Sequence, residues 1–364
     1  MTIAKIEVWN FRPLMRDGPY AMSHVTQDSA YGRLYKVTGK DGGQGFGEVV
    51  FPPSLPQAEQ MGKIAEERAF LALLIGQPLD ALLDLAEDLR ERGKAWGGVA
   101  FGLETAWHDL TARQKACPLF DLLGGARVTA VPDYFSISER TPERIRERVA
   151  LAGAERGVFQ LKLGVGSLED DVEHVTALLA ALSQNQIVLA DANGGWSVDR
   201  ACETMAQLSD PRIVWEEPCA LYDDNVEVMK RSGIAVMVDQ SVSSAEVAFR
   251  AIEEGLAQSI CIKPAFLGGL TVARQVRDAA AAAGMQMRID GPWCGDIATA
   301  AIVHLAVGAP ADLLISCCDL REPLSLTPCL NGIETLPDTC IAPKSGPGLG
   351  FVPQALGAPE HAYS

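Results

Sequence analysis

Short apolar stretches recur along the chain from residue 131 onward, and each except the last is followed by apolar positions at helical spacing. The eight stretches are VPDYFSI, FQLKL, IVLAD, IVWEE, AVMVD, SICIK, MQMRID and DLLIS. Strands that alternate with helices are typical of parallel sheets with crossover helices. Eight such units predict an α/β fold of the (β/α)8, or modified TIM, barrel type, in which catalytic groups lie at the C-terminal ends of the strands.

The residues before the barrel follow a different pattern. Residues 2–14 and 31–50 alternate like strands, and the second range is broken by a turn at 40–43. Residues 57–115 carry mostly helical spacing. We therefore expect an α+β capping domain over residues 1–125, a barrel over 126–320, and a segment rich in Pro and Gly over 321–364 that returns to the capping domain.

The charge balance narrows the class of partner. The chain has 31 Lys and Arg residues against 47 Asp and Glu residues, which is a formal charge of −16. This excess of negative charge disfavours nucleic acids and anionic membranes as partners. No uninterrupted apolar run reaches the roughly 18 residues of a membrane span, and the N-terminus does not resemble a secretory signal. We expect a cytoplasmic protein that acts on a small molecule.

Ionisable side chains end five consecutive predicted strands, the second to the sixth. They are Lys162, Asp191, Glu216, Asp239 and Lys263. A single carboxylate at a strand end is as well explained by capping of the next helix, but three in register would repel one another strongly. A divalent cation would relieve this repulsion, and all-oxygen ligands suit Mg²⁺ better than zinc.

The two lysines belong to the second and sixth strands, which lie on opposite sides of an eight-stranded barrel. Each alone is also compatible with an ordinary charged surface position. Together, a desolvated Lys162 and Lys263 beside a cation can act as an acid/base pair, one taking a proton and the other returning one.

These motifs resemble the enolase superfamily, specifically its muconate-lactonizing-enzyme-like branch, over nearly the whole chain. The motifs that carry the resemblance are Gln160-Leu161-Lys162, Asp191-Ala192-Asn193, Glu216-Glu217-Pro218, Asp239-Gln240, and Lys263 followed by Gly268-Gly269. The resemblance implies that Asp191, Glu216 and Asp239 bind Mg²⁺. It also implies that Lys162 and Lys263 abstract and return a proton α to a carboxylate, through an enediolate that the metal stabilises.

Two positions depart from the family pattern. Gln160 stands where many members carry a lysine, and Gln240 stands where a glutamate is common. Neither change removes a metal ligand or a base. No histidine ends the sixth or seventh strand, which argues against the mandelate-racemase branch with its histidine base.

A narrower resemblance concerns the substrate. The stretches RIDGPWCGDIATAAIVHL, RDGPYAMSH and QLK resemble members that act on proline derivatives, namely cis-3-hydroxy-L-proline dehydratases and hydroxyproline-betaine 2-epimerases. An ammonium group in such a substrate needs anionic or aromatic partners, which Asp290, Trp293 and Asp296 at the seventh strand end can supply. Asp296 equally fits a role in capping the following helix, and Trp293 equally fits packing.

Four further residues complete the candidate substrate-binding set. Gln160 and Asn193 lie beside the expected metal ligands, and Tyr20 and Ser23 belong to a loop expected to close over the barrel mouth. Plain domain packing would also explain that loop.

We therefore predict a Mg²⁺-dependent enzyme for a small, amino-acid-derived carboxylate, with dehydration of a hydroxyproline-type substrate favoured. The alternatives are a 2-epimerase or racemase of a proline betaine or dipeptide, a muconate-type cycloisomerase, and, from another class, a metal-binding barrel without catalysis. The family often forms homo-oligomers, but no stripe in the sequence identifies an interface.

Overall fold

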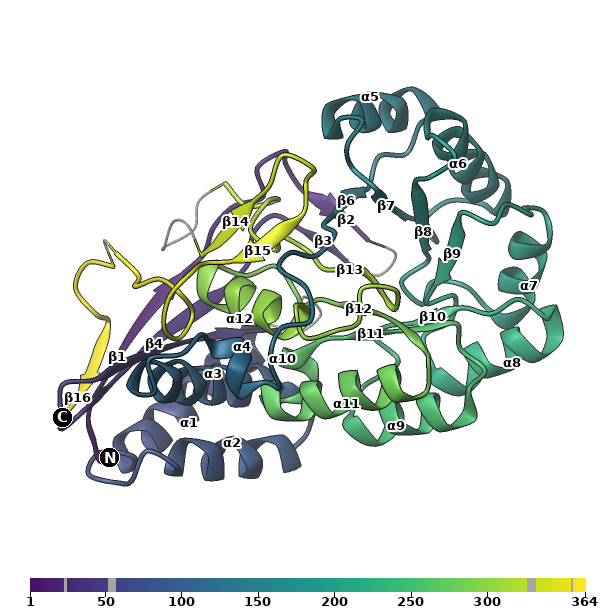
Figure 1. Ribbon diagram of the computed structural model, residues 1–364. Helices are drawn as coiled ribbons and strands as arrows, with labels where there is room; N and C mark the ends of the chain where they lie inside the picture. Colours follow the sequence, from purple (N-terminus) through teal and green to yellow (C-terminus); the bar gives the residue numbers. More distant parts are fainter. Residues whose placement is uncertain (23–24, 52–56, 326–331, 355) are drawn as a thin grey trace.

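The computed structural model describes residues 1–22, 25–51, 57–325, 332–354 and 356–364, and its largest element is a parallel barrel (Figure 1). Within these residues the strand order is sequential, from β6 to β13. A parallel bridge between Asp133 and Cys317 joins the first and last strands. The strands are β6 (Tyr134–Ile137), β7 (Val158–Lys162), β8 (Ile187–Asp191), β9 (Ile213–Glu216), β10 (Met237–Val238), β11 (Ser259–Ile262), β12 (Gln286–Ile289) and β13 (Leu314–Ser316).

A helix follows each barrel strand up to β12 and returns the chain to the start of the next strand. The helices are α5 (Pro142–Ala152), α6 (Leu168–Ala181), α7 (Val198–Ala206), α8 (Tyr222–Ser232), α9 (Ala245–Glu254), α10 (Pro264–Leu267) with α11 (Leu270–Ala282), and α12 (Asp296–Ala306). Helices α5, α6, α7 and α9 begin after a hydroxyl N-cap that accepts a backbone N–H three residues on, namely Thr141, Ser167, Ser197 and Ser244.

Along strand β7, successive side chains alternate between the hydrophobic core and the cavity at the barrel mouth. Phe159, Leu161 and Leu163 are fully buried in the main hydrophobic core, which includes residues of the surrounding helices. Gln160 and Lys162 have the opposite orientation and line a cavity at the barrel mouth. The fold class predicted from the sequence is confirmed.

The capping domain is built on an antiparallel sheet with the order β16-β1-β4-β5. Its strands are β1 (Ile3–Phe11), β4 (Gly32–Gly39), β5 (Gln44–Val50) and β16 (His361–Tyr363), so the two chain ends meet in one sheet (Figure 1). The helical elements are α1 (Gln57–Leu73), α2 (Ala81–Glu91), the 3-10 turn η1 (Lys94–Trp96), α3 (Gly97–Gln114) and α4 (Leu119–Leu122). Two short pairs, β2 (Tyr20–Ala21) with β3 (Thr26–Gln27) and β14 (Ile333–Thr335) with β15 (Ile341–Pro343), complete the strands.

Two buried carboxylates of the capping domain bind the N-termini of barrel helices. Glu48 on β5 accepts hydrogen bonds from the backbone N–H groups of Gly295 and Ala298 at the start of α12. Glu104 on α3 accepts one from Thr271 in the first turn of α11. Because a helix N-terminus presents unpaired N–H groups and partial positive charge, each carboxylate fixes the capping domain against the barrel.

None of the helices in the described ranges is both long enough and apolar enough to pass through a lipid bilayer.

Helix α3 packs very closely on β5, and glycine makes this contact sterically feasible. A methyl group at Gly98 would overlap the carbonyl oxygen of Val50. At Gly62, inside α1, an added methyl group would meet no atom of the described residues within 4 Å. Glycine in a helix is ordinarily the less stable choice by about 0.5–1 kcal/mol relative to alanine.

We expect Gly98→Ala to lower the free energy of unfolding by about 1–3 kcal/mol, because the helix must move away from the strand. Gly62→Ala is the matched control and should raise it by up to about 1 kcal/mol. Urea unfolding followed by circular dichroism measures both. A stabilising effect at both positions would contradict the described packing of α3 on β5.

Candidate active site

The strand register brings the predicted ionisable residues side by side. Lys162, Asp191 and Glu216 are the last residues of β7, β8 and β9, and they are direct partners across the parallel sheet. Asp239 follows β10, and Lys263 follows β11. The strand order places β7 and β11 four strands apart in a barrel of eight, so the two lysines approach the mouth from opposite sides.

Each lysine forms an ion pair with one of the carboxylates. The Lys162 Nζ lies 2.6 Å from Asp191 Oδ2, and the Lys263 Nζ lies 2.8 Å from Asp239 Oδ2. Asn193 supports the first pair, because its backbone N–H and its side-chain amide both donate to Asp191, at 2.8 and 2.9 Å. The cluster is thus held together by charge-assisted hydrogen bonds, which are stronger than neutral ones.

Two further donors lie between the carboxylates. The Gln160 Nε2 donates to Asp191 Oδ2 and to Glu216 Oε2, at 3.0 Å in each case. Arg288 on β12 forms a bidentate pair with Glu216, with Nη1 at 2.6 Å and Nη2 at 2.5 Å. Its Nη2 also lies 3.8 Å from Asp239. Gln160 and Arg288 therefore connect the three carboxylates to one another.

Negative charge exceeds positive charge in this buried cluster. The carboxylates are Asp191, Glu216, Glu217, Asp239 and Asp290, all nearly or fully inaccessible. Lys162 pairs with Asp191, Lys263 pairs with Asp239, and Arg288 pairs with Glu216 and Asp290. The acidic groups therefore outnumber the cations that pair with them, and a bound cation would reduce this excess.

Burial and the neighbouring charged groups shift the pKa values of these acids. Burial raises the pKa of Glu216 against the attraction of Arg288, and the neighbouring Asp191 and Asp239 raise it further. Burial and Asp239 likewise raise the pKa of Glu217 to about 8. Burial alone would raise the pKa of Asp239, but Lys263 and Arg288 outweigh it and lower that pKa to about 2.

Asp191, Glu216 and Asp239 could hold a metal ion, with oxygen ligands that suit Mg²⁺. Among the described residues, however, no three acidic, histidine or cysteine side chains are gathered into a ready coordination shell. The carboxylate oxygens are bonded to Gln160 and to the cationic side chains instead. A bound cation would take over some of these bonds, so the residues fit it by charge and donor type.

The same carboxylates determine the protonation of the lysines. Burial opposes the charge of Lys162, but Asp191 and its neighbours outweigh burial and raise the pKa of Lys162. Burial and Asp239 have the same opposing effects at Lys263, and its pKa is raised too. The protein's own groups therefore favour the ammonium form of both lysines. Either lysine can become a base near neutral pH only if positive charge is added at its carboxylate partner.

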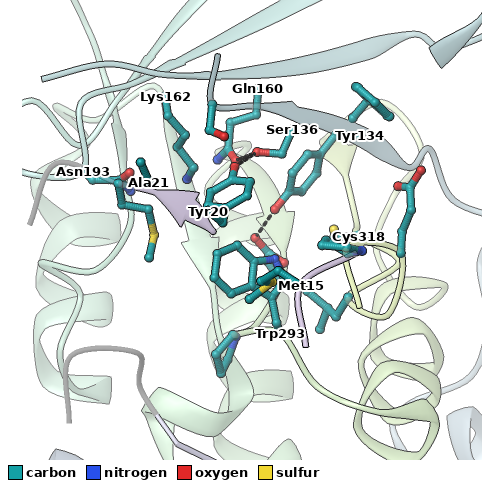
Figure 2. A pocket seen from close by; sticks show the side chains of 18 of the residues that line it. Met15, Tyr20, Ala21, Tyr134, Ser136, Gln160, Lys162, Asn193, Trp293 and Cys318 are labelled. Atoms are coloured by element: carbon teal, nitrogen blue, oxygen red, sulfur yellow. Dashed lines mark hydrogen bonds between the residues drawn. The ribbon is translucent and has the colours of Figure 1, made fainter. Parts of the chain in front are cut away.

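A cavity of about 1130 Å³ opens above the cluster and is lined by both lysines. One wall of the cavity includes an aromatic pair in which the rings of Tyr20 and Trp293 meet edge to face, with centroids 4.6 Å apart (Figure 2). Asp290, which also lines the cavity, accepts a hydrogen bond from Tyr134 at 2.9 Å through Oδ2. The Oδ1 atom of Asp290 is buried and has no hydrogen-bond partner among the described residues.

The structure brings most of the predicted substrate-binding residues to this cavity: Tyr20, Gln160, Asn193, Asp290 and Trp293. Asp296, which the sequence placed at the substrate, is not among the described residues that line the cavity. It is fully buried at the start of α12, where Oδ1 accepts hydrogen bonds from Arg321 and from the backbone of Gly332. Ser23 lies outside the described residues.

Sequence reasoning missed Arg288. The signal was present, because Arg288 and Asp290 are two residues apart on one strand and so share its inward face. An arginine inside a barrel strand is costly to bury unless it is paired, so its position pointed to acidic partners at the mouth. Ser136 on β6 was missed as well, and a lone serine in a strand carries no comparable signal.

Arg288→Met should lower the free energy of unfolding by about 3–5 kcal/mol, because it leaves Glu216 as an unpaired buried charge. Arg231→Met removes an equally short pair with Asp199, 2.7 Å long but exposed to solvent, and should cost less than about 1 kcal/mol. Thermal unfolding of both variants tests this difference. Similar small losses would show that Arg288 does not compensate the buried carboxylates.

The comparisons with known proteins agree with this geometry. The family described as "Enolase C-terminal domain-like" matches residues 143–355. The N-terminal domain of the mandelate racemase / muconate lactonizing enzyme family matches residues 5–124. A crystal structure of an enolase superfamily member from Roseovarius nubinhibens ISM, complexed with magnesium, superimposes with a TM-score of 0.87 at 26% identity and covers 99% of each chain.

Two curated relatives are similar in sequence. The chain is 32% identical over 265 residues to a cis-3-hydroxy-L-proline dehydratase of Roseibium aggregatum, covering 72% of each chain. It is 28% identical over 346 residues to muconate cycloisomerase 1-1 of Acinetobacter lwoffii, covering 92% of this chain and 89% of that one. The chain therefore belongs to the mandelate racemase/muconate lactonizing enzyme family of the enolase superfamily, as a lyase or isomerase.

Proposed function

We propose that this enzyme abstracts the proton α to the carboxylate of a small amino-acid-derived substrate, with Lys162 and Lys263 as the acid/base pair. One observation carries the proposal: two buried lysines face each other across one cavity, and each is paired with a carboxylate of the same cluster. A substrate carbon held between them exposes opposite faces to the two ammonium groups. Positioned proton transfer of this kind contributes rate factors of roughly 10²–10⁴.

The proposed cofactor is Mg²⁺, held by Asp191, Glu216 and Asp239. When bound, it supplies positive charge for the substrate carboxylate, which becomes more negative as the α proton leaves. The charge excess of the cluster supports a divalent ion. With the ion bound, the three carboxylates would attract Lys162 and Lys263 less strongly. The pKa values of both lysines would then be lower, so that one could take a proton and the opposite one could donate one.

The substrate proposed here carries an ammonium group next to its carboxylate. Asp290 supports this class, because it lines the cavity and its buried Oδ1 has no hydrogen-bond partner within the part of the chain that the structure describes. A buried carboxylate oxygen without a donor is costly, and a substrate N–H would satisfy it. Trp293 lines the same part of the cavity, and an indole face also attracts a cation.

Dehydration of a hydroxyproline-type amino acid is the reaction we favour, and the similarity to the Roseibium dehydratase supports it. In cis-3-hydroxy-L-proline the C2 proton and the C3 hydroxyl lie on opposite ring faces. One lysine takes the C2 proton, and the electron pair of that C–H bond forms a C2–C3 double bond. The facing lysine gives its proton to the C3 hydroxyl, which leaves as water. The facing pair Lys162 and Lys263 matches this stereochemistry.

The second candidate is 2-epimerisation of a proline betaine or a dipeptide. It uses the same two lysines, but the facing lysine returns its proton to C2 instead of to a leaving group. The aromatic pair Tyr20 and Trp293 favours this alternative for a quaternary nitrogen, because aromatic walls bind such cations.

The lysine pair is tested by replacing each member with methionine. Lys162→Met and Lys263→Met should each lose turnover by a factor of at least about 10², since a complete turnover needs both groups. In D₂O, one variant should still exchange the substrate α proton, and the other should not. Proton NMR of cis-3-hydroxy-L-proline and related proline derivatives with Mg²⁺ measures exchange, water loss and inversion separately.

Lys230→Met is the control, because Lys230 is exposed on α8 and should leave turnover unchanged. Full turnover in either Lys162→Met or Lys263→Met would refute the proposed mechanism. Inversion at C2 without loss of water would select the epimerase.

Asp290→Asn should raise KM for an amino-acid substrate roughly 10-fold or more, because it removes the charge that faces the ammonium group. Tyr134→Phe removes the hydrogen bond that Asp290 accepts through Oδ2 but keeps its charge, and should raise KM much less. Steady-state kinetics of the two variants separate the roles. An unchanged KM in Asp290→Asn would argue against an ammonium site at this position.

A further inference from the structure

Residues 13–22 of the capping domain, called the capping segment here, reach the cavity and place Tyr20 next to the first barrel strand. The Tyr20 hydroxyl contacts the Ser136 Oγ on β6. The Tyr20 ring packs on Trp293, which follows β12 (Figure 2). Tyr20 therefore touches the barrel at two places.

Ser136 links Tyr20 to Gln160 beside the carboxylate cluster by hydrogen bonds. Its Oγ lies 3.0 Å from Gln160 Oε1. The other end of the same amide, Nε2, donates to Asp191 and Glu216. Tyr20, Ser136 and Gln160 thus form a continuous hydrogen-bond chain, shown in part in Figure 2, from the capping segment to two of the proposed metal ligands.

The direction of the protons in this chain follows from the groups themselves. The Gln160 Oε1 has no proton, so Ser136 must donate to it. A serine hydroxyl has one proton, so the Tyr20 hydroxyl must be the donor to Ser136. Tyr20 must then be neutral, and burial, which raises its pKa, favours that form. Every donor points toward the carboxylates, and bonds aligned in this way strengthen one another.

The two acids determine which end of the Gln160 amide faces them, and Ser136 binds the other end. If the amide were rotated by half a turn, Oε1 would face Asp191 and Glu216, and this contact would be unfavourable because both partners are acceptors. With the donor end on the acids, the Ser136 hydroxyl donates to Oε1 and fixes the position of the amide.

A second connection joins the capping segment to the same strand. Arg140 donates to the carbonyl of Lys162 at 3.1 Å and to the carbonyl of Ala21 at 3.5 Å. Gln160 and Lys162 are both on β7, so the segment is tied to the strand that carries one of the two lysines.

From this geometry we propose that Ser136 is a positioning residue that couples the docking of the capping segment to metal binding. The proposal rests on the metal site of the proposed function. The segment holds Ser136 through Tyr20, Ser136 orients Gln160, and Gln160 holds Asp191 and Glu216 in the arrangement that receives the ion. If docking of the capping segment raises the affinity for the ion by some factor, thermodynamic linkage requires that the bound ion raises the docking equilibrium constant by the same factor.

This coupling gives a role to the glutamine that replaces the lysine of many family members. A lysine side chain has donors only, so it could not accept the Ser136 hydrogen bond. The chain from Tyr20 to the carboxylates requires an acceptor and a donor on one side chain. Gln160 supplies both, and a neutral amide also adds no positive charge that would repel the ion.

The test measures Mg²⁺ affinity by calorimetry and amide hydrogen exchange in residues 13–22. Ser136→Ala and Tyr20→Phe should each weaken Mg²⁺ binding roughly 10-fold, the lower end of the effect of residues that orient metal ligands. The double variant should bind Mg²⁺ no more weakly than either single variant, because both substitutions break the same hydrogen-bond chain.

Mg²⁺ should slow amide hydrogen exchange in residues 13–22 of the wild-type protein and not in Ser136→Ala. Ser138→Ala, which removes a hydroxyl just beyond the same strand, is the control for Mg²⁺ affinity.

The outcomes separate the two proposals. If Asp239→Asn abolishes Mg²⁺ binding while Ser136→Ala and Tyr20→Phe bind it like the wild type, the coupling is overturned and the proposed function stands. Additive losses in the double variant also overturn the coupling, because they would mean independent effects. A wild-type protein that binds no Mg²⁺ overturns both proposals.

Discussion

The structure depends on the burial of more acidic than basic groups at the mouth of the barrel. Each carboxylate there needs a donor, and the nearest strands supply Lys162, Lys263, Arg288 and Gln160. These donors hold the acids in place but do not neutralise them. Burial, together with the neighbouring acids, raises the pKa values of Glu216 and Glu217, while the same acids outweigh burial and raise the pKa values of both lysines. An added divalent charge therefore changes two properties at once, since it compensates the acids and releases the lysines for proton transfer.

The capping domain is bonded to two barrel helices, and one of its segments lines the cavity. Glu48 and Glu104 fix it to the N-termini of two barrel helices, so its orientation relative to the mouth is set by buried hydrogen bonds. From that position the segment before β2 brings Tyr20 over the cavity. A substrate in this cavity would be enclosed between the strand ends and the aromatic pair Tyr20 and Trp293, an arrangement that would help to exclude water from the reacting groups.

Sequence reasoning found the barrel because its period-two and helical patterns repeat, and it found the five ionisable strand ends because they recur in register. It identified Gln160 as a departure but not as the link between two carboxylates, since hydrogen-bond partners across strands depend on side-chain conformation. Arg288 was missed although its position on the strand indicated an inward-facing side chain. Asp296 was expected at the substrate, whereas in the structure it pairs with Arg321. The ion-pair partner of each residue lies far away in the sequence, so packing between distant elements determines it.

The central claim is that the charge excess at the barrel mouth forms a site for one divalent ion. Calorimetric titration of the wild-type protein with Mg²⁺ tests it most directly, with Asp191→Asn, Glu216→Gln and Asp239→Asn as companions. The account predicts saturable binding of one ion per chain in the wild type and loss of that binding in each variant. Absence of saturable binding, or binding that survives the removal of all three carboxylates, would contradict it.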